Sequence, residues 1–232
     1  MMIGNYISIV SGSKSVALKA PSGLTATLIS GGVKWDWTAG DAAAQTEAWC
    51  RNDSNAYTTV TYTINAGTVT KSEAVDLCVP NAPVDVRYCK IRSLKDGVYS
   101  DFTAEVSIAM LGVEKVVNKG FDDTSAWTLT EATITISGGL LRFNNVSAAN
   151  KGAYQGPTLT AGKKYRVTTT IVNYSYGHIQ MFDGTSYGVV RFTNCIASEV
   201  FTATNGYIAL YSSEAGTILN IDSVSVKEVL MP

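Results

Sequence analysis

Charged residues are scarce in this sequence. They make up 16% of the 232 residues, against roughly 25% in an average soluble domain. The 18 basic and 19 acidic residues nearly cancel, and no basic block occurs anywhere along the chain. The positive surface that nucleic acid or an anionic membrane requires is therefore missing, and we expect neither partner.

Histidine and long apolar runs are also scarce. The single histidine, His178, excludes His-rich zinc sites and any Ser-His-Asp arrangement built on another ring. It follows Gly177 in an expected turn, so we assign it no catalytic role. No apolar run approaches the roughly 20 residues that span a bilayer.

We find no nucleophile elbow, phosphate loop or metal-ligand pair, so an enzyme is the least favoured of three functional hypotheses. A glycosidase needs two facing carboxylates, and no spacing selects a pair among Asp122, Asp123, Asp183, Glu199, Glu214 and Asp222.

The four cysteines divide unevenly. Cys50, Cys78 and Cys89 fall in the first half and Cys195 alone in the second. An odd split suits reduced thiols made in a cytoplasm, so we expect no structural disulfide.

The first twenty residues, 1–20, form an expected N-terminal arm. They lack a basic region at their start, so we expect no secretion signal. The stretch IGNYISIV has β character. It is either a strand of the first domain or a loose tail, or else an anchoring arm that pairs with a sheet edge.

Threonine is abundant, with 26 residues, many of them in β-type runs. From Pro21 onward, short strands alternate with turn signals in the pattern of a sandwich. Val33, Trp35 and Trp37 share one face by strand alternation, and we expect them in a core. The first series of expected strands reads LTATLIS, VKWDW, the stretch around Trp49, TTVTYTI, AVDLCV, VDVRYCKIRS and TAEVSIAM.

Residues 21–112 resemble a fibronectin type III domain. The resemblance rests on PSGLTA, VKWDW and KIRSLKDGVYSDFTAEVSI. It departs at the corner tyrosine of that fold, because Tyr88 is out of register. Such domains are mostly spacers or adhesion modules, so the resemblance implies presentation rather than chemistry. It also makes the strands of Cys50 and Cys89 neighbours, so these thiols could face each other.

Residues 113–232 resemble a jelly-roll carbohydrate-binding module of the family 4/9 type. The segments LGVEKVVNKGFDDTSAW, AYQGPTLTAGKKYRV, FTATNGYIALYSSEAGT and NIDSVSVKEV follow one another in that order. The fold class we expect is therefore all-β, with two tandem antiparallel β-sandwiches. Jelly rolls have many unrelated functions, so the resemblance is stronger for fold than for function.

Two segments of the second unit show strand alternation. In 165–172, Tyr165, Val167, Thr169 and Ile171 share one face. In 178–182, Ile179 and Met181 share one face, opposite the side chains of His178, Gln180 and Phe182. The resemblance implies a concave sheet face that binds sugar through aromatic rings and polar groups. The alternative is that this polar face is only exposed to solvent and binds nothing. The candidate glycan-binding residues are Tyr154, Tyr174, Tyr176, His178, Gln180, Phe182, Tyr187 and Arg191.

A structural calcium is a further expectation. Asp122 and Asp222 lie where the resembling modules often hold this ion, and calcium takes six to eight oxygen ligands. The alternative is that these aspartates only cap turns. No other cofactor is expected.

The combination of units resembles decoration or fibre proteins of bacteriophage particles. We therefore expect a non-enzymatic virion surface protein, alone or as a homo-oligomer, that docks on capsid or tail proteins by its N-terminal part and displays the jelly roll for adhesion to surface glycans. Lysis of the host would release it without an export signal. The alternative is an accessory carbohydrate-binding protein of a bacterial polysaccharide-degrading system.

Overall fold

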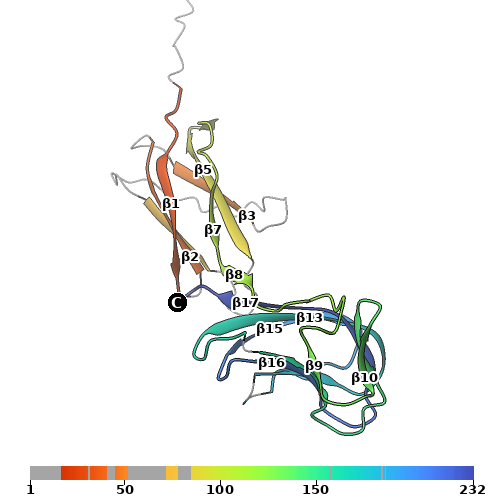
Figure 1. Cartoon of the computed structure of the whole chain (residues 1–232). Coiled ribbons are helices and arrows are strands. Elements are labelled where there is room, and N and C mark those ends of the chain that lie inside the picture. The colour runs from red at the N-terminus through yellow and green to blue at the C-terminus, as the bar shows by residue number, and fades with distance from the viewer. Residues whose placement is uncertain are drawn as a thin grey trace, which may run out of the picture.

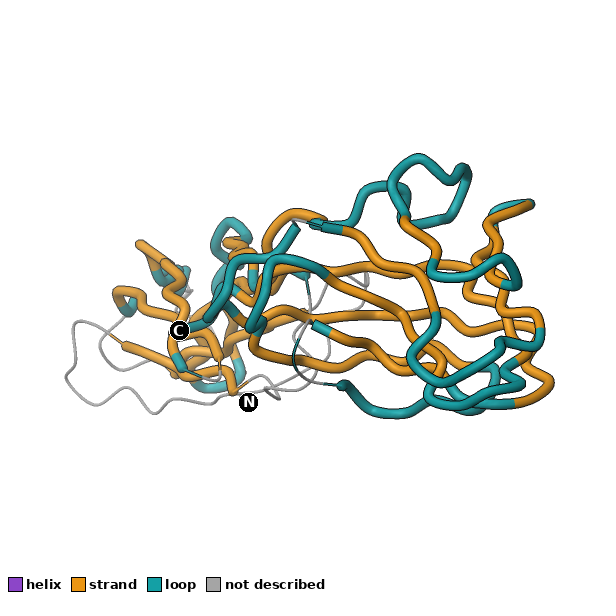
Figure 2. Tube along the Cα trace, turned by 60° about the horizontal axis from the view of Figure 1, so that its bottom comes forward, coloured by secondary structure: helices purple, strands orange, loops and turns teal. Residues whose placement is uncertain are grey.

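The computed structural model describes most of the chain, and every element in that part is a strand (Figures 1 and 2). The predicted all-β fold of two antiparallel sandwiches is confirmed. The described part of the chain contains no helix long and apolar enough to cross a membrane. The described residues are 17–30, 32–40, 45–51, 72–77, 85–156, 158–183, 185 and 187–232.

The first sandwich has two small sheets. One has the strand order β1-β2-β4, and the other has the order β3-β5-β6 with β7 also paired to β5. The IGNYISIV segment, the expected strand TTVTYTI and Cys78 lie outside the described residues. The strands are β1 (Ser22–Ile29), β2 (Gly32–Thr38), β3 (Gln45–Arg51), β4 (Ser72–Leu77), β5 (Val86–Lys95), β6 (Val98–Tyr99) and β7 (Val106–Ala109).

Alternation along β2 builds the first core. Val33, Trp35 and Trp37 are buried on one face, as the pattern predicted. Asp96 and Gly97 both have positive φ and join β5 to β6 in a two-residue turn, a geometry that matches the twist of the paired strands.

The second sandwich pairs a six-stranded sheet with a four-stranded sheet. The larger has the order β10-β11-β17-β13-β15, with β8 also paired to β17; the smaller has the order β14-β16-β12-β9. The larger sheet contains β8 (Leu111–Glu114), β10 (Ile134–Ser137), β11 (Leu140–Asn144), β13 (Lys164–Tyr176), β15 (Cys195–Thr202) and β17 (Ile218–Val229). The smaller sheet contains β9 (Thr128–Leu129), β12 (Gly152–Gln155), β14 (Ile179–Phe182) and β16 (Ile208–Ser212).

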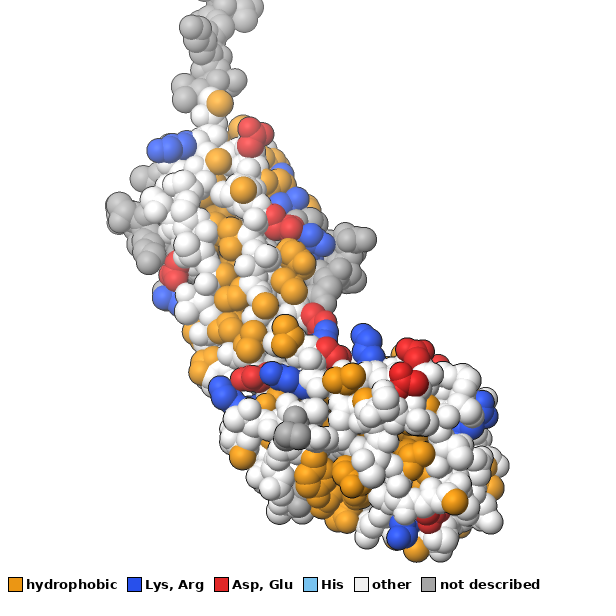
Figure 3. Space-filling model, in the orientation of Figure 1, with side chains coloured by type: hydrophobic (Ala, Val, Ile, Leu, Met, Phe, Trp, Pro, Cys, Tyr) orange, Lys and Arg blue, Asp and Glu red, His pale blue; other side chains and the backbone are white. Residues whose placement is uncertain are grey.

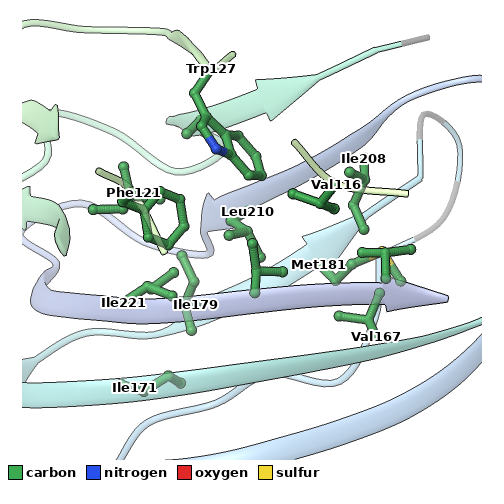
Figure 4. Packing of buried hydrophobic residues seen from close by; sticks show 14 of the residues in the cluster. Val116, Phe121, Trp127, Val167, Ile171, Ile179, Met181, Ile208, Leu210 and Ile221 are labelled. Atoms are coloured by element: carbon green, nitrogen blue, oxygen red, sulfur yellow. The ribbon is translucent and has the colours of Figure 1, made fainter. Parts of the chain in front are cut away.

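Apolar side chains from both sheets fill the second core (Figure 4). The faces predicted for 165–172 and 178–182 are confirmed, because Tyr165, Val167, Ile179 and Met181 are all buried. Figure 4 also shows Phe121 and Trp127 packed over this core. The two segments belong to opposite sheets, however, so the polar faces that they present point to opposite sides of the sandwich.

The end of β17 joins the two sandwiches. Val229 and Met231 are buried in the core cluster of the first sandwich, together with Leu111 of β8. The predicted division between residues 112 and 113 stays a prediction, and it falls inside β8. The sheet that contains β13 and β15 is the one beside the first sandwich, so the smaller sheet lies on the far side (Figure 1).

Candidate ligand-binding face

The outer face of the smaller sheet carries a row of aromatic side chains. The register places Phe182 opposite Ala209 and Ala209 opposite Tyr154. Directly opposite residues point to the same face, and the intervening residues Ile208 and Leu210 point into the core. We call this the aromatic face. Its described members are Thr128, Gly152, Tyr154, Gln180, Phe182, Ala209 and Tyr211, with Tyr187 and Tyr207 alongside.

The rings of the aromatic face contact one another. Phe182 stacks on Tyr211 with a centroid distance of 5.6 Å, and it lies 4.5 Å from Tyr187. Tyr207 lies 6.1 Å from Phe182 and 6.2 Å from Tyr154. These separations are typical of favourable aromatic pairs, so the rings support one another in a fixed array. Figure 3 shows hydrophobic side chains at the surface of the second sandwich, on its side away from the first.

Glycines make room for two of these tyrosines. A Cβ atom added at Gly152 would lie 1.8 Å from the Leu210 carbonyl oxygen and 2.7 Å from Cδ1 of Tyr211. A Cβ atom at Gly156 would lie 2.6 Å from that of Tyr207. The missing side chains let the Tyr211 ring and the Cβ atom of Tyr207 lie close against the backbone.

A pocket of about 480 Å³ opens on this face. This volume is within the range of small-molecule sites, roughly 300 to 1,000 Å³. The described lining combines three aromatic rings with glycine backbone and includes no charged residue. It can therefore offer apolar surface together with phenol hydroxyls. The lining residues are Tyr154, Gly156, Gly206, Tyr207 and Tyr211.

Burial raises the pKa of the Tyr211 phenol above its ordinary value of 10.0, and the neighbouring phenols of Tyr207, Tyr154 and Tyr187 add to the increase. Tyr211 therefore remains protonated throughout the physiological pH range. A neutral phenol both donates and accepts a hydrogen bond, which suits a ligand with hydroxyl groups.

Four of the eight residues predicted from the sequence meet on the aromatic face. Tyr154, Gln180 and Phe182 stand on its strands, and Tyr187 pairs with Phe182 at its edge. Tyr154 is 37% exposed and Tyr187 is 47% exposed, so both rings are accessible. Their role in glycan binding stays a prediction.

His178 lies at the end of this face, just before β14. Its Nδ1 lies 2.6 Å from Oε1 of Glu214, and its ring packs edge-on against Phe192 at 5.7 Å. Arg191 is directed away from the face. It is the register partner of the inward-facing Ile179, and its guanidinium lies 4.0 Å from the Glu199 carboxylate.

Tyr174 and Tyr176 belong to the larger sheet, at the end of β13. Tyr174 is half-buried and packs against the second core, while Tyr176 is 53% exposed beside Gly216. The structure therefore does not place these two tyrosines on the strands of the aromatic face.

Tyr207 and Tyr211 were not among the residues predicted from the sequence, although both line the pocket. The signal was present in the stretch YIALY, residues 207–211. Its alternation predicts that Tyr207, Ala209 and Tyr211 share one face and that Ile208 and Leu210 are buried.

The two aspartates proposed for calcium lie on adjacent segments. The Lys119 carbonyl accepts a hydrogen bond from the Val224 N–H, which brings the segment of Asp122 beside the strand of Asp222. Both aspartates are exposed. Within the described ranges, no three His, Cys, Asp or Glu residues gather as metal ligands. Calcium also accepts carbonyl ligands, so the site stays a prediction.

Among known proteins, this chain is similar only to solved structures. No family model and no curated protein matches this chain. The Clostridium thermocellum xylanase 10B fragment with a CBM22-1 module, complexed with xylohexaose, is 16% identical over 52% of this chain, with a TM-score of 0.33. The chain spans only 29% of that structure's length.

Two other structures align along nearly their whole length. A carbohydrate-binding module of the β-sandwich superfamily is 10% identical, covering 91% of this chain and 99% of that one, with a TM-score of 0.34. The chicken interferon gamma receptor alpha chain is 9% identical, covering 92% and 99%, with a TM-score of 0.30. All three TM-scores are below 0.5, so these similarities carry no argument about function.

Proposed function

We propose that this chain is a non-enzymatic glycan-binding protein and that the aromatic face of its second sandwich binds a neutral sugar chain. One observation carries the proposal: the aromatic rings gather on one outer sheet face, around a pocket of about 480 Å³. Sugars present C–H surface that packs on aromatic rings and hydroxyls that bond to phenols and amides. The aromatic face offers both kinds of group, with the amide supplied by Gln180.

The charge of the face supports a neutral ligand. Among the described residues that line the pocket there is no carboxylate, lysine or arginine. A glycosidase requires two facing carboxylates, and a uronic acid or sulfate group is usually matched by a cation. The side chain of Asp183, next to Phe182, is buried and accepts hydrogen bonds from Thr185 and Thr204, so it holds a turn.

The test is a glycan array probed with the full chain, followed by calorimetric titration of the best ligand. The array contains neutral, uronic acid and sulfated oligosaccharides. Tyr211→Ala should weaken binding by about 5-fold to 30-fold, because covering roughly 40 to 80 Å² of ring at about 25 cal/mol per Å² contributes about 1 to 2 kcal/mol. Tyr99→Ala removes an exposed tyrosine of the first sandwich and is the matched control.

Two outcomes of this test would contradict the proposal. Absence of binding to every glycan would remove the function, and binding restricted to anionic glycans would contradict the neutral class. Because the Tyr211 pKa is raised, affinity should also stay constant from about pH 6 to pH 9.

The biological setting stays a prediction in both of its forms. A virion surface protein would dock on capsid or tail proteins, while an accessory protein would act beside polysaccharide-degrading enzymes. The IGNYISIV segment expected to dock lies outside the described residues. Detection of this chain in purified particles favours the virion, whereas a catalytic domain encoded in the same reading frame favours the accessory protein.

A further inference from the structure

Two cysteines of the first sandwich lie directly opposite each other on neighbouring strands. The antiparallel register of β3 and β5 pairs Cys50 with Cys89. Opposite residues of such a pair point to the same face. The side chains are 1% and 0% exposed and belong to the first core cluster. The two thiols therefore lie on the same side of one sheet, within one hydrophobic core.

This register meets the main geometric requirement of a disulfide. Opposite Cα atoms in antiparallel strands are roughly 4.5 to 5.5 Å apart, within the range of about 4.4 to 6.8 Å that disulfides span. Opposite Cβ atoms, at roughly 4.5 to 5.5 Å, must approach to about 3.5 to 4.5 Å. Among the described strands β3 pairs only with β5, so within the described part this small adjustment involves a single strand pair.

We infer that Cys50 and Cys89 form a reversible cross-strand disulfide when the protein meets an oxidising thiol–disulfide pool. The oxidant is a small disulfide such as oxidised glutathione. One protein thiolate attacks it, giving a mixed disulfide and releasing one glutathione. The second protein thiolate then displaces the other glutathione. Two protein thiols are oxidised to one disulfide, one oxidised glutathione is reduced to two thiols, and the two protons pass to those products.

The bond would act as a conditional clamp on the first sandwich. It would tie β3 to β5 and restrict the unfolded chain, which raises stability. The closer Cβ approach would strain the bond slightly, and strained disulfides are more easily reduced. The inference is independent of the proposed glycan function, because both cysteines belong to the first sandwich.

The experiment uses the full chain. Because buried thiols react slowly in the folded state, the protein is first unfolded with denaturant and dithiothreitol and then refolded in a glutathione redox buffer. Thiols that have not reacted are then alkylated, and peptides are mapped by mass spectrometry. We expect one intramolecular bond, Cys50 to Cys89, with Cys78 and Cys195 alkylated. Four alkylated cysteines, or a bond that involves Cys78 or Cys195, would overturn the inference.

Substitutions and melting curves complete the test. Cys50→Ser and Cys89→Ser should each abolish the bond, and Cys195→Ser is the matched control that keeps it. The oxidised wild type should melt at least about 5 °C higher than the same protein treated with dithiothreitol. An oxidised form that melts at or below the reduced form would show that the bond distorts the sheet, and would also overturn the inference.

Discussion

Asp85 offers the sharpest test of how the two sandwiches are joined. Its carboxylate lies 2.5 Å from Nη2 of Arg166 and also bonds to the Lys227 ammonium. Arg166 and Lys227 are directly opposite each other on β13 and β17. Asp85→Asn would therefore leave two like charges facing each other, in addition to removing two ion pairs.

The size of the expected change in unfolding free energy depends on how exposed the Asp85 side chain is. The Asp85 side chain is 33% exposed, so solvent screens both ion pairs and each contributes about 0.5 to 1 kcal/mol. Asp85→Asn should lower the free energy of unfolding by about 1 to 2 kcal/mol. The backbone carbonyl of Asp85 still accepts the Met110 and Leu111 N–H groups in this variant, so the local fold should persist.

The assay is urea unfolding followed by tryptophan fluorescence at low and high salt. Asp101→Asn, which removes an exposed carboxylate of the first sandwich, is the control and should change stability by less than about 0.5 kcal/mol. The deficit of Asp85→Asn should shrink at high salt. An Asp85→Asn protein as stable as the control would refute the reasoning.

The pH dependence gives a second check on Asp85. Burial alone would raise its pKa, but the hydrogen bond and charge of Lys227, followed by those of Arg166, outweigh burial and hold the pKa below 3.8. A lowered carboxyl pKa adds stability that is present above the ordinary value and is lost as pH falls through the folded value. Wild type and Asp85→Asn should therefore differ at pH 7 and converge in strong acid.

Two further predictions concern the second sandwich. Gly152→Ala should destabilise the protein by about 2 to 4 kcal/mol and weaken glycan binding, because the added Cβ meets the Leu210 carbonyl and the Tyr211 ring. Thermal melting and ligand titration of the variant check the two effects. A variant that melts like the wild type would contradict this packing. If calcium binds at Asp122 and Asp222, a chelator should lower the melting temperature of the second sandwich alone; an unchanged calorimetric trace with chelator and with added calcium would remove that site.

Local patterns were enough to predict the fold class and the faces of individual strands. Alternation in 165–172 and 178–182 identified the buried side chains correctly, as it did for Trp35 and Trp37. Alternation in 207–211 likewise places Tyr207 and Tyr211 on the outer face of their strand. The aromatic face was thus partly predictable, because the side a strand residue faces depends on its position alone.

The assignment of strands to sheets depends on contacts between distant segments. Tyr174 and Arg191 were expected beside Phe182, yet Tyr174 belongs to the opposite sheet and Arg191 is the register partner of an inward-facing residue. Spacing along the chain does not predict such pairings, since strands close in sequence can belong to different sheets of a sandwich.

The sequence by itself determined that this chain is all-β and which side chains are buried in the strands around Trp35, Tyr165 and Ile179. These properties follow from side-chain alternation and from backbone preferences within a few residues. Only the tertiary structure decided that the tyrosine rings surround one pocket and that Asp85 meets Lys227, 142 positions away. Those contacts arise because the sheets pack so as to bury both cores, and this packing brings together residues that no local pattern connects.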